Sequence, residues 1–172
     1  MEVTEVSNMV SSYGKDIYNF CRQLTRNKAE ADELYQDTFL KAIELCHKID
    51  KENNPKSFLL SIALRLWKNR RRKIAWRNRI AAMESYRDES DYESYPMGLA
   101  RSPEEELLEK EKTELVVQSV KSLRKEYQSV VYLYYAAEMS LKEIGIILHL
   151  PEGTIKSRLY KARNELRKRI GG

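Results

Sequence analysis

The helical spacing of its apolar residues constrains this chain most, because the spacing runs through most of the sequence with little interruption. Only six Gly and four Pro occur among 172 residues, too few for a sheet built from many tight turns. The spacing predicts an all-α fold of two small helical bundles. The first predicted helix has a candidate break near Gly14. The predicted helices span about 4–26, 28–47, 57–79, 102–123, 125–137, 140–148 and 152–169.

Charge is segregated along the chain, although the net charge is only +5. Residues 1–80 carry 16 Lys and Arg against 10 Asp and Glu, and residues 107–172 carry 13 against 8. Residues 81–106 carry 2 against 8 and lose the helical period among Ser, Tyr, Pro and Gly. We therefore predict two basic domains, each facing a polyanion, joined by a flexible acidic linker. For either basic segment taken alone, the alternative is that its charges only keep the helices soluble.

The cysteines, the lengths of the apolar runs and the first residues indicate in which cellular compartment the chain works. Cys21 and Cys46 lack metal-ligand spacing and lie in apolar helical stretches, which argues against a disulfide framework and fits a reducing cytoplasm. No run of about 18 apolar residues is present, so we expect no direct membrane insertion. The first twelve residues lack the pattern of a secretory signal. A cytoplasmic location is therefore expected.

Residues 140–163 carry the most specific pattern in the chain. Ser140 and Glu143 form a capping box that begins one helix. Gly145 is small enough for another helix to approach closely, Leu150 supplies an apolar plug in the turn, and Pro151 leads into the next helix. This order of cap, helix, plug and second helix predicts a helix-turn-helix.

The second helix of this motif has one apolar face and one polar face. Its apolar positions are Ile155, Leu159, Ala162 and Leu166. In a helix-turn-helix the second helix enters the major groove, where Lys reads guanine and a ring can meet a thymine methyl. The candidate base-reading residues are Lys156, Ser157, Tyr160 and Lys161. The candidate phosphate contacts are Thr154, Arg158 and Arg163.

Two further helices carry interface patterns. The second predicted helix places an apolar Leu among polar residues, which is a small protein-docking pattern. That face holds Glu33, Gln36, Asp37, Leu40 and Lys41. The third predicted helix interleaves Trp67, Ile74 and Trp76 with Lys and Arg, which suits a single DNA strand. A solvated face with one stray Leu, and a basic helix end with one buried Trp, are the structural alternatives.

Three stretches together resemble one family. GTIKSRLYKARNELRK, preceded by SLKEIGIILHLPE, resembles region 4 of the extracytoplasmic-function sigma factors of bacterial RNA polymerase. AEADELYQDTFLKAIE resembles region 2.2 of that family, and PKSFLLSIALRLWKNRRRK resembles regions 2.3 and 2.4. The resemblance covers about residues 5–79 and 107–169. It implies a sigma factor that reads the minus-thirty-five promoter element with residues 107–172 and opens the minus-ten element with residues 1–80.

The resemblance also implies partners and site residues. The partners are promoter DNA, an anti-sigma factor, and core RNA polymerase through its clamp coiled coil and flap. The implied core-binding residues are Glu33, Gln36, Asp37, Leu40 and Lys41. The implied minus-ten residues are Phe58, Arg65, Trp67, Lys68, Asn69, Arg71 and Arg72, with residues 50–55 as a pocket wall. The chain departs from the family's common residues at Phe58 (Trp), Arg65 (Asn), Arg124 (Pro) and Met139 (Gly).

Two other classes of function remain as alternatives. A stand-alone helix-turn-helix regulator would bind duplex DNA by itself, usually as a dimer, but leaves the Gln36–Asp37 face unexplained. An enzyme is a poor third, because His47 and His149 are the only histidines and stand in no catalytic constellation. No phosphate-binding loop, zinc spacing or nucleophile motif is present, so no cofactor or metal is expected.

Overall fold

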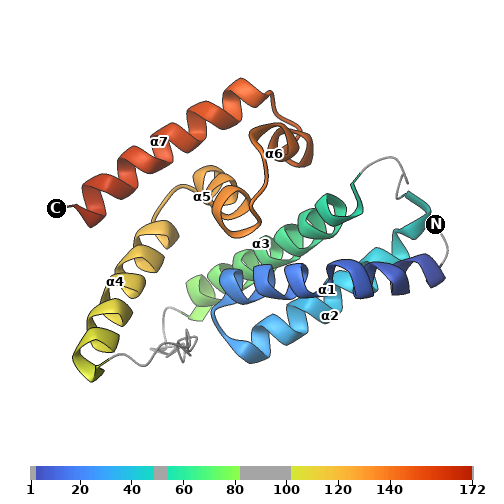
Figure 1. The fold of residues 1–172 in the computed structure, drawn as a ribbon, viewed down its shortest axis with the longest axis horizontal. Helices are drawn as coiled ribbons and strands as arrows, with labels where there is room; N and C mark the ends of the chain where they lie inside the picture. The colour runs from blue at the N-terminus through green and yellow to red at the C-terminus, as the bar shows by residue number, and fades with distance from the viewer. Residues whose placement is uncertain (1–2, 49–53, 82–101, 172) are drawn as a thin grey trace. The chain divides into compact units, whose positions relative to one another are not determined.

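The computed structural model describes residues 3–48, 54–81 and 102–171, and every regular element in these ranges is a helix (Figure 1). The chain divides into two compact units, Met1–Glu93 and Ser94–Gly172. The predicted all-α, two-bundle fold is therefore confirmed. The predicted linker, apart from its ends, and residues 50–53 of the predicted pocket wall lie outside the described residues. Among the described helices, none is both long and apolar enough to cross a membrane.

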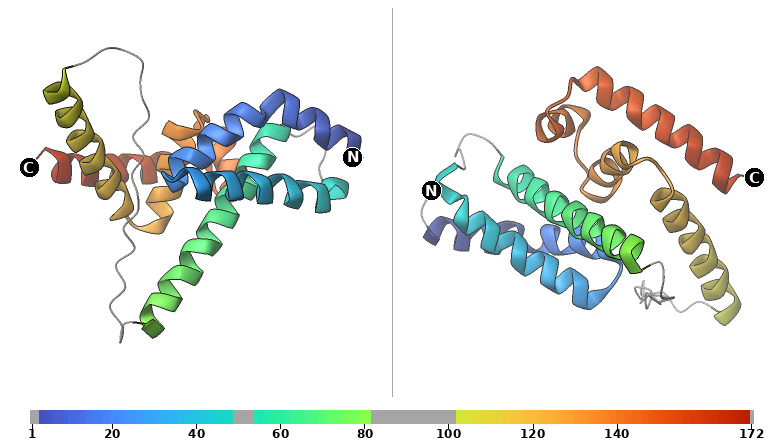
Figure 2. Two further views of the ribbon diagram at one scale, coloured as in Figure 1. Left: turned by 90° about the horizontal axis from the view of Figure 1, so that it is seen from below. Right: turned by 180° about the vertical axis from the view of Figure 1, so that it is seen from behind.

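The first unit packs three long helices against one another. α1 spans Val3–Thr25, α2 spans Lys28–Glu44 and α3 spans Pro55–Ala81, with a short 3-10 turn, η1, at Cys46–Lys48. Each of α1, α2 and α3 contacts the other two. α3 is the longest of the three and continues past its partners (Figure 2). The largest fully buried side chains of this unit include Ile17, Phe20, Leu34, Leu59 and Leu60.

Two local predictions in this unit are wrong, and both have a packing reason. α1 runs unbroken through Gly14, which is buried because the Tyr35 hydroxyl lies 2.9 Å from the position a Cβ would take. The glycine therefore serves close approach and not a break. α3 begins at Pro55, two residues before the start predicted at 57. The Asn54 side chain accepts the Lys56 amide at 3.1 Å, and proline suits the first helical position.

Residues 102–171, the described part of the second unit, form four α-helices. α4 spans Pro103–Lys121, α5 spans Lys125–Val131, α6 spans Leu141–Leu148 and α7 spans Glu152–Ile170. A π-helical turn, η2 at Tyr132–Ala136, continues α5 where the sequence predicted regular helix. The capping box that begins α6 is confirmed, and Ser102 with Glu105 forms another at the start of α4. The core cluster consists of Val120, Leu123, Tyr127, Val131 and Ala162.

α4 is buried only near its C-terminal end, at Ser119 and Val120. Its helical spacing was predicted, but the apolar residues of its earlier turns do not enter the core of the second unit. These exposed residues are Leu107, Leu108, Leu115 and Val116. Residues 102–106, which the sequence analysis counted with the linker, form the cap and first turn of this helix.

The turn between α6 and α7 depends on a glycine. His149 adopts a left-handed conformation with φ of 55°, and the Leu150 amide donates to the Gly145 carbonyl at 2.9 Å. The Leu150 carbonyl oxygen then lies only 2.7 Å from where a Cβ on Gly145 would stand. The predicted approach of another helix to Gly145 is confirmed, since the Glu152 amide nitrogen and the Ile155 side chain of α7 lie 3.7 Å and 3.8 Å from the same position, but the turn backbone comes closest.

Gly145→Ala is therefore expected to destabilise the C-terminal unit, because the added methyl group meets backbone that cannot rotate away. The cost is about 1–3 kcal/mol for overpacking, which exceeds the gain of about 1 kcal/mol in helix propensity. Thermal unfolding followed by circular dichroism measures it. Gly153→Ala is the control, because nothing lies within 4 Å of that Cβ position and the propensity gain is unopposed. Equal stability of the two variants would contradict this account of the turn.

Candidate functional site

The predicted base-reading residues lie together on the exposed side of α7. Lys156, Ser157, Tyr160 and Lys161 are all exposed, and Tyr160 is 66% accessible. At 100° per residue, the four span an arc of about 140°. Ile155, Leu159 and Ala162 on the opposite side are buried. One helix face thus presents two ammonium groups, a hydroxyl and a phenol ring to a partner, a set of groups that suits base edges in a major groove.

The predicted phosphate contacts on α7 are held by contacts within the second unit. Arg158 lies 3.6 Å from the Glu126 carboxylate, and Thr154 is half-buried. The Arg163 Nε donates to the Tyr135 hydroxyl at 2.7 Å, which is the main reason its pKa is raised. Its guanidinium also lies 5.4 Å and 5.7 Å from the ring centres of Tyr134 and Tyr135. Arg158 and Arg163 are therefore oriented by contacts within the protein itself.

The tyrosines that hold Arg163 belong to the π-helical turn η2, a kind of distortion that often occurs at functional sites. Tyr134 and Tyr135 pack edge-to-face with ring centres 4.9 Å apart. Sequence analysis missed their role. The signal was a pair of adjacent tyrosines ahead of the motif, but nothing in the sequence indicates that the helix widens at this point.

The predicted docking residues share one exposed face of α2. Glu33, Gln36 and Lys41 are exposed, Asp37 is half-buried, and Leu40 is 60% accessible although large and apolar. The Lys41 ammonium lies 2.7 Å from Glu44 on the same helix. An accessible leucine within a polar rim is the arrangement of a protein-docking surface.

Arg70 of α3 connects this docking face to the rest of the first unit, a role that sequence analysis missed. Its guanidinium forms an ion pair with Asp37 and lies 3.7 Å from Glu33. Arg70 was visible as one member of a basic run, but its partners are 33 and 37 residues away in the sequence. The ion pairs fix α3 relative to the docking face of α2.

The predicted minus-ten residues divide between two sides of α3. Arg65, Asn69 and Arg72 are exposed and Phe58 is half-buried. At 100° per residue these four lie within an arc of about 60°. We call this arc, from Phe58 to Arg72, the α3 stripe. Lys68 lies beside it and is half-buried.

Trp67 does not belong to the α3 stripe, which corrects the prediction that its ring faces DNA. The indole is only 6% accessible because it packs into the core of the first unit. Arg71, one helical turn later, places its guanidinium 5.0 Å from the centre of the Trp67 ring. Both residues therefore lie on the side of α3 opposite to the α3 stripe.

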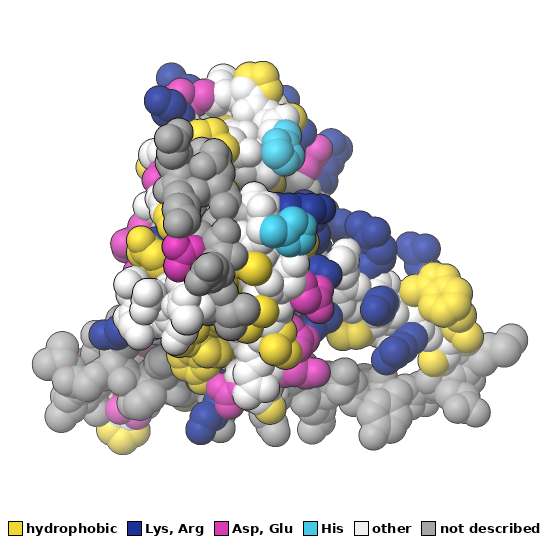
Figure 3. Space-filling model, turned by 90° about the vertical axis from the view of Figure 1, so that its right-hand side faces the viewer, with side chains coloured by type: hydrophobic (Ala, Val, Ile, Leu, Met, Phe, Trp, Pro, Cys, Tyr) yellow, Lys and Arg dark blue, Asp and Glu magenta, His cyan; other side chains and the backbone are white. Residues whose placement is uncertain are grey.

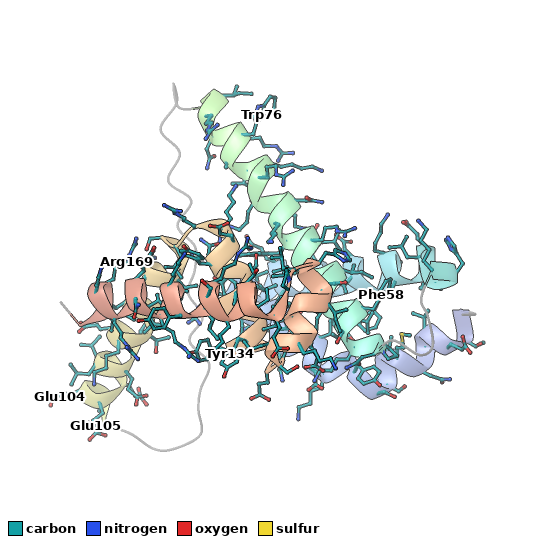
Figure 4. All side chains as sticks on the ribbon, turned by 90° about the horizontal axis from the view of Figure 1, so that it is seen from above. Phe58, Trp76, Glu104, Glu105, Tyr134 and Arg169 are labelled. Carbon is teal, nitrogen blue, oxygen red and sulfur yellow. The ribbon has the colours of Figure 1, made fainter. Side chains whose placement is uncertain are left out.

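The last three turns of α3 stand free of the first unit. Every residue from Arg71 to Ala81 is exposed, and no acidic residue occurs between Glu52 and Glu84. Lys and Arg side chains crowd this part of the surface around large hydrophobic groups (Figure 3). Trp76 is 65% accessible and lies near the free end of the helix, far from Phe58 at its start (Figure 4).

The ion pair between Asp37 and Arg70 predicts a coupled effect on stability. Asp37→Ala and Arg70→Ala should each lower the free energy of unfolding by about 1 kcal/mol or less, because both groups are partly exposed. The double variant should lose less than the sum of the two changes. Urea denaturation of the four proteins measures this. Gln36→Ala, on the same face, should change stability by less than about 0.5 kcal/mol. Full additivity would mean that the pair contributes nothing.

Comparison with known proteins also separates the chain into two regions, one in each unit. Residues 9–77 match Sigma-70 region 2, and residues 113–166 match Sigma-70 region 4. The chain is 29% identical over 164 residues to the ECF RNA polymerase sigma factor SigW of Bacillus subtilis, covering 95% of this chain and 88% of that protein. It is 26% identical over 165 residues to RNA polymerase sigma factor YlaC of the same species, covering 96% and 91%.

The solved structures agree on the fold. The sigma factor RpoE of Bartonella quintana, crystallised with the anti-sigma factor NepR, aligns with a TM-score of 0.72 and 20% identity, covering 98% of each chain. The two family regions occur in the expected order and contain the exposed faces of α2, α3 and α7. The chain therefore belongs to the extracytoplasmic-function group of the sigma-70 family of RNA polymerase sigma factors.

Proposed function

We propose that this sigma factor docks on core RNA polymerase through the α2 face and brings the α3 stripe and the α7 face to promoter DNA. The first unit would act at the minus-ten element and the second at the minus-thirty-five element, joined by the segment between α3 and α4. The observation that supports this best is the exposed Leu40 within its polar rim, in the same unit as an acid-free basic helix. A stand-alone regulator needs no such docking face, and the match to region 2 does not favour it.

At the minus-thirty-five element, α7 would read base edges through its exposed face. Lys156 and Lys161 would donate to guanine acceptors, Ser157 would serve either base type, and Tyr160 would contact a thymine methyl. Arg163 would meet phosphate in the orientation that Tyr134 and Tyr135 impose. Arg158 and Thr154 would support the register of the helix on the DNA.

At the minus-ten element, the α3 stripe would hold the strand that separates. Arg65 and Arg72 would track phosphates or stack on bases, while Phe58 would offer a ring edge at the start of the helix. Arg65 stands where the family commonly has Asn, so we expect a base preference different from that of relatives. Trp67 would act only from within, by fixing the helix that carries the stripe.

We also propose that the chain works in the cytoplasm and is held inactive by an anti-sigma factor. The structural relative RpoE is itself bound to the anti-sigma factor NepR, which supports this kind of partner. The α2 face is the surface that an inhibitor would need to cover to prevent docking on the polymerase.

Run-off transcription tests the proposal directly. Core polymerase, genomic DNA fragments and the full chain are expected to give transcripts with discrete start sites that core polymerase alone does not give. Mapping these starts would define the promoter elements. Transcripts that do not depend on the chain, or binding of the chain to duplex DNA as a dimer without polymerase, would favour the stand-alone regulator.

Leu40→Arg is expected to weaken binding to core polymerase by at least about tenfold, because a charge replaces the apolar anchor of the docking face. Fluorescence anisotropy of the labelled chain titrated with core polymerase measures the affinity. Val10→Arg is the matched control, since Val10 is an exposed apolar residue on α1 and lies outside the proposed face. Equal loss in both variants would show that the effect is not specific to the α2 face.

Lys156→Ala is expected to reduce discrimination between a mapped promoter and one with a substituted minus-thirty-five element. A good base contact contributes about 1–3 kcal/mol, so the ratio of transcript yields should fall by about fivefold or more. Lys125→Ala, an exposed lysine at the start of α5, should leave the ratio unchanged. An unchanged ratio for Lys156→Ala would assign that lysine to phosphate or to no contact.

A further inference from the structure

We propose that Trp76 is a stacking platform for an unpaired DNA base, at the far end of the α3 stripe. This inference deepens the proposed function and rests on it. It assigns the aromatic contact to a tryptophan near the free end of α3, in place of the buried Trp67. The occupant is single-stranded DNA, as the direction, the exposure and the charged surroundings of Trp76 indicate.

The direction of Trp76 follows from its spacing. Phe58 and Trp76 are 18 residues apart, which is five full turns of an α-helix, so both side chains leave α3 in the same direction. The distance between the two positions along the helix is about 27 Å. Arg65, Asn69 and Arg72 occupy the same side between them. Trp76 thus extends the α3 stripe by one further turn.

The exposure of Trp76 is unusual for an indole. Trp67 is 6% accessible and Trp76 is 65% accessible, although only nine residues separate them. Nine residues turn the helix by 900°, so the two rings point to opposite sides. Ile80, four residues after Trp76, is 62% accessible and extends the apolar surface beside the ring.

The charge around Trp76 identifies the kind of ligand. Arg72 and Lys73 lie one turn before the ring and Arg79 lies one turn after it, all exposed and without an acidic residue on this helix. Lys73 and Arg77 repel each other at a spacing of four residues, so a polyanion would stabilise this end of α3. An exposed ring among cations is how proteins bind single-stranded nucleic acid.

A membrane surface fits these residues less well. A helix that lies on a membrane gathers its apolar residues on one face. Here Ile74, which is 46% accessible, lies 200° around the helix from Trp76, and cations occupy the sides between them. The apolar residues therefore do not form one continuous face, whereas a single exposed ring is sufficient for base stacking.

Tryptophan fluorescence of the full chain tests the inference. The protein has two tryptophans, so Trp67→Phe leaves Trp76 as the only source of tryptophan emission, which is excited at wavelengths that tyrosine does not absorb. A 12-nucleotide single strand is expected to quench this emission, while a 12-base-pair duplex at equal phosphate concentration quenches it much less. Emission that no single strand changes would overturn the proposal. Equal quenching by duplex would also overturn it, because phosphate contact alone would then explain the effect.

Binding of the same labelled single strand gives a second measurement that does not depend on the Trp67 variant. Trp76→Ala should weaken binding by about tenfold, as expected for loss of one stacked base, while Trp76→Phe should retain most of the affinity. Ile74→Ala is the matched control, because it removes another exposed apolar residue from the other side of the same helix. Equal affinities of the Trp76→Ala and Ile74→Ala variants would overturn the stacking role.

Run-off transcription by the unmodified chain separates this inference from the proposed function. Specific transcripts together with unchanged strand binding by Trp76→Ala would refute the stacking role and leave the sigma-factor proposal intact. Absence of specific transcripts from the unmodified chain would refute the proposed function itself. Trp76 and Ile74 are exposed, so circular dichroism should show an unchanged fold for their variants, and it also checks that Trp67→Phe, which leaves a smaller ring in the core, remains folded.

Discussion

The burial of one side of α3 is the constraint on which the first unit depends. Leu60, Leu64 and Trp67 fill the core, and the same helix carries Arg65, Asn69 and Arg72 on its outer side. A helix buries only about half of its circumference against two neighbours, so the charged half has to remain accessible. The chain thus obtains its basic surface from the element that organises its core, without a separate binding loop.

Electrostatic contacts within each unit then orient the exposed groups. Arg70 connects α3 to Asp37 on the docking face of α2, and Arg163 is held by Tyr134 and Tyr135. Such partly exposed contacts contribute little to stability. Their effect is to limit the directions that the charged groups can take, which reduces the ordering cost when a partner binds.

Sequence alone predicted most of the fold because helix signals are local. Capping at Ser140 with Glu143 and the close approach at Gly145 of α6 are set by neighbours within a few residues, and both predictions were correct. The family resemblance and the polar faces of α2 and α7 also follow from short patterns. Whether their residues bind DNA or polymerase is not decided by the fold.

What the sequence did not reveal depends on contacts between distant segments. Trp67 and Trp76 look alike in a basic run, and only the extent of α1 and α2 beside α3 decides which ring is covered. Leu107 and Leu115 have helical spacing, but both remain exposed in the second unit. The widening at Tyr132–Ala136 and the partners of Arg70 likewise require the packed structure.

The central claim is that the outer side of α3 holds the opened strand while α2 anchors the chain on the polymerase. Permanganate footprinting of a mapped promoter, with core polymerase and the chain, tests it most directly. We predict reactive thymines near the minus-ten element with the unmodified chain. The double charge reversal Arg65→Glu with Arg72→Glu should abolish them while polymerase binding persists. Unchanged thymine reactivity in that variant would contradict the account.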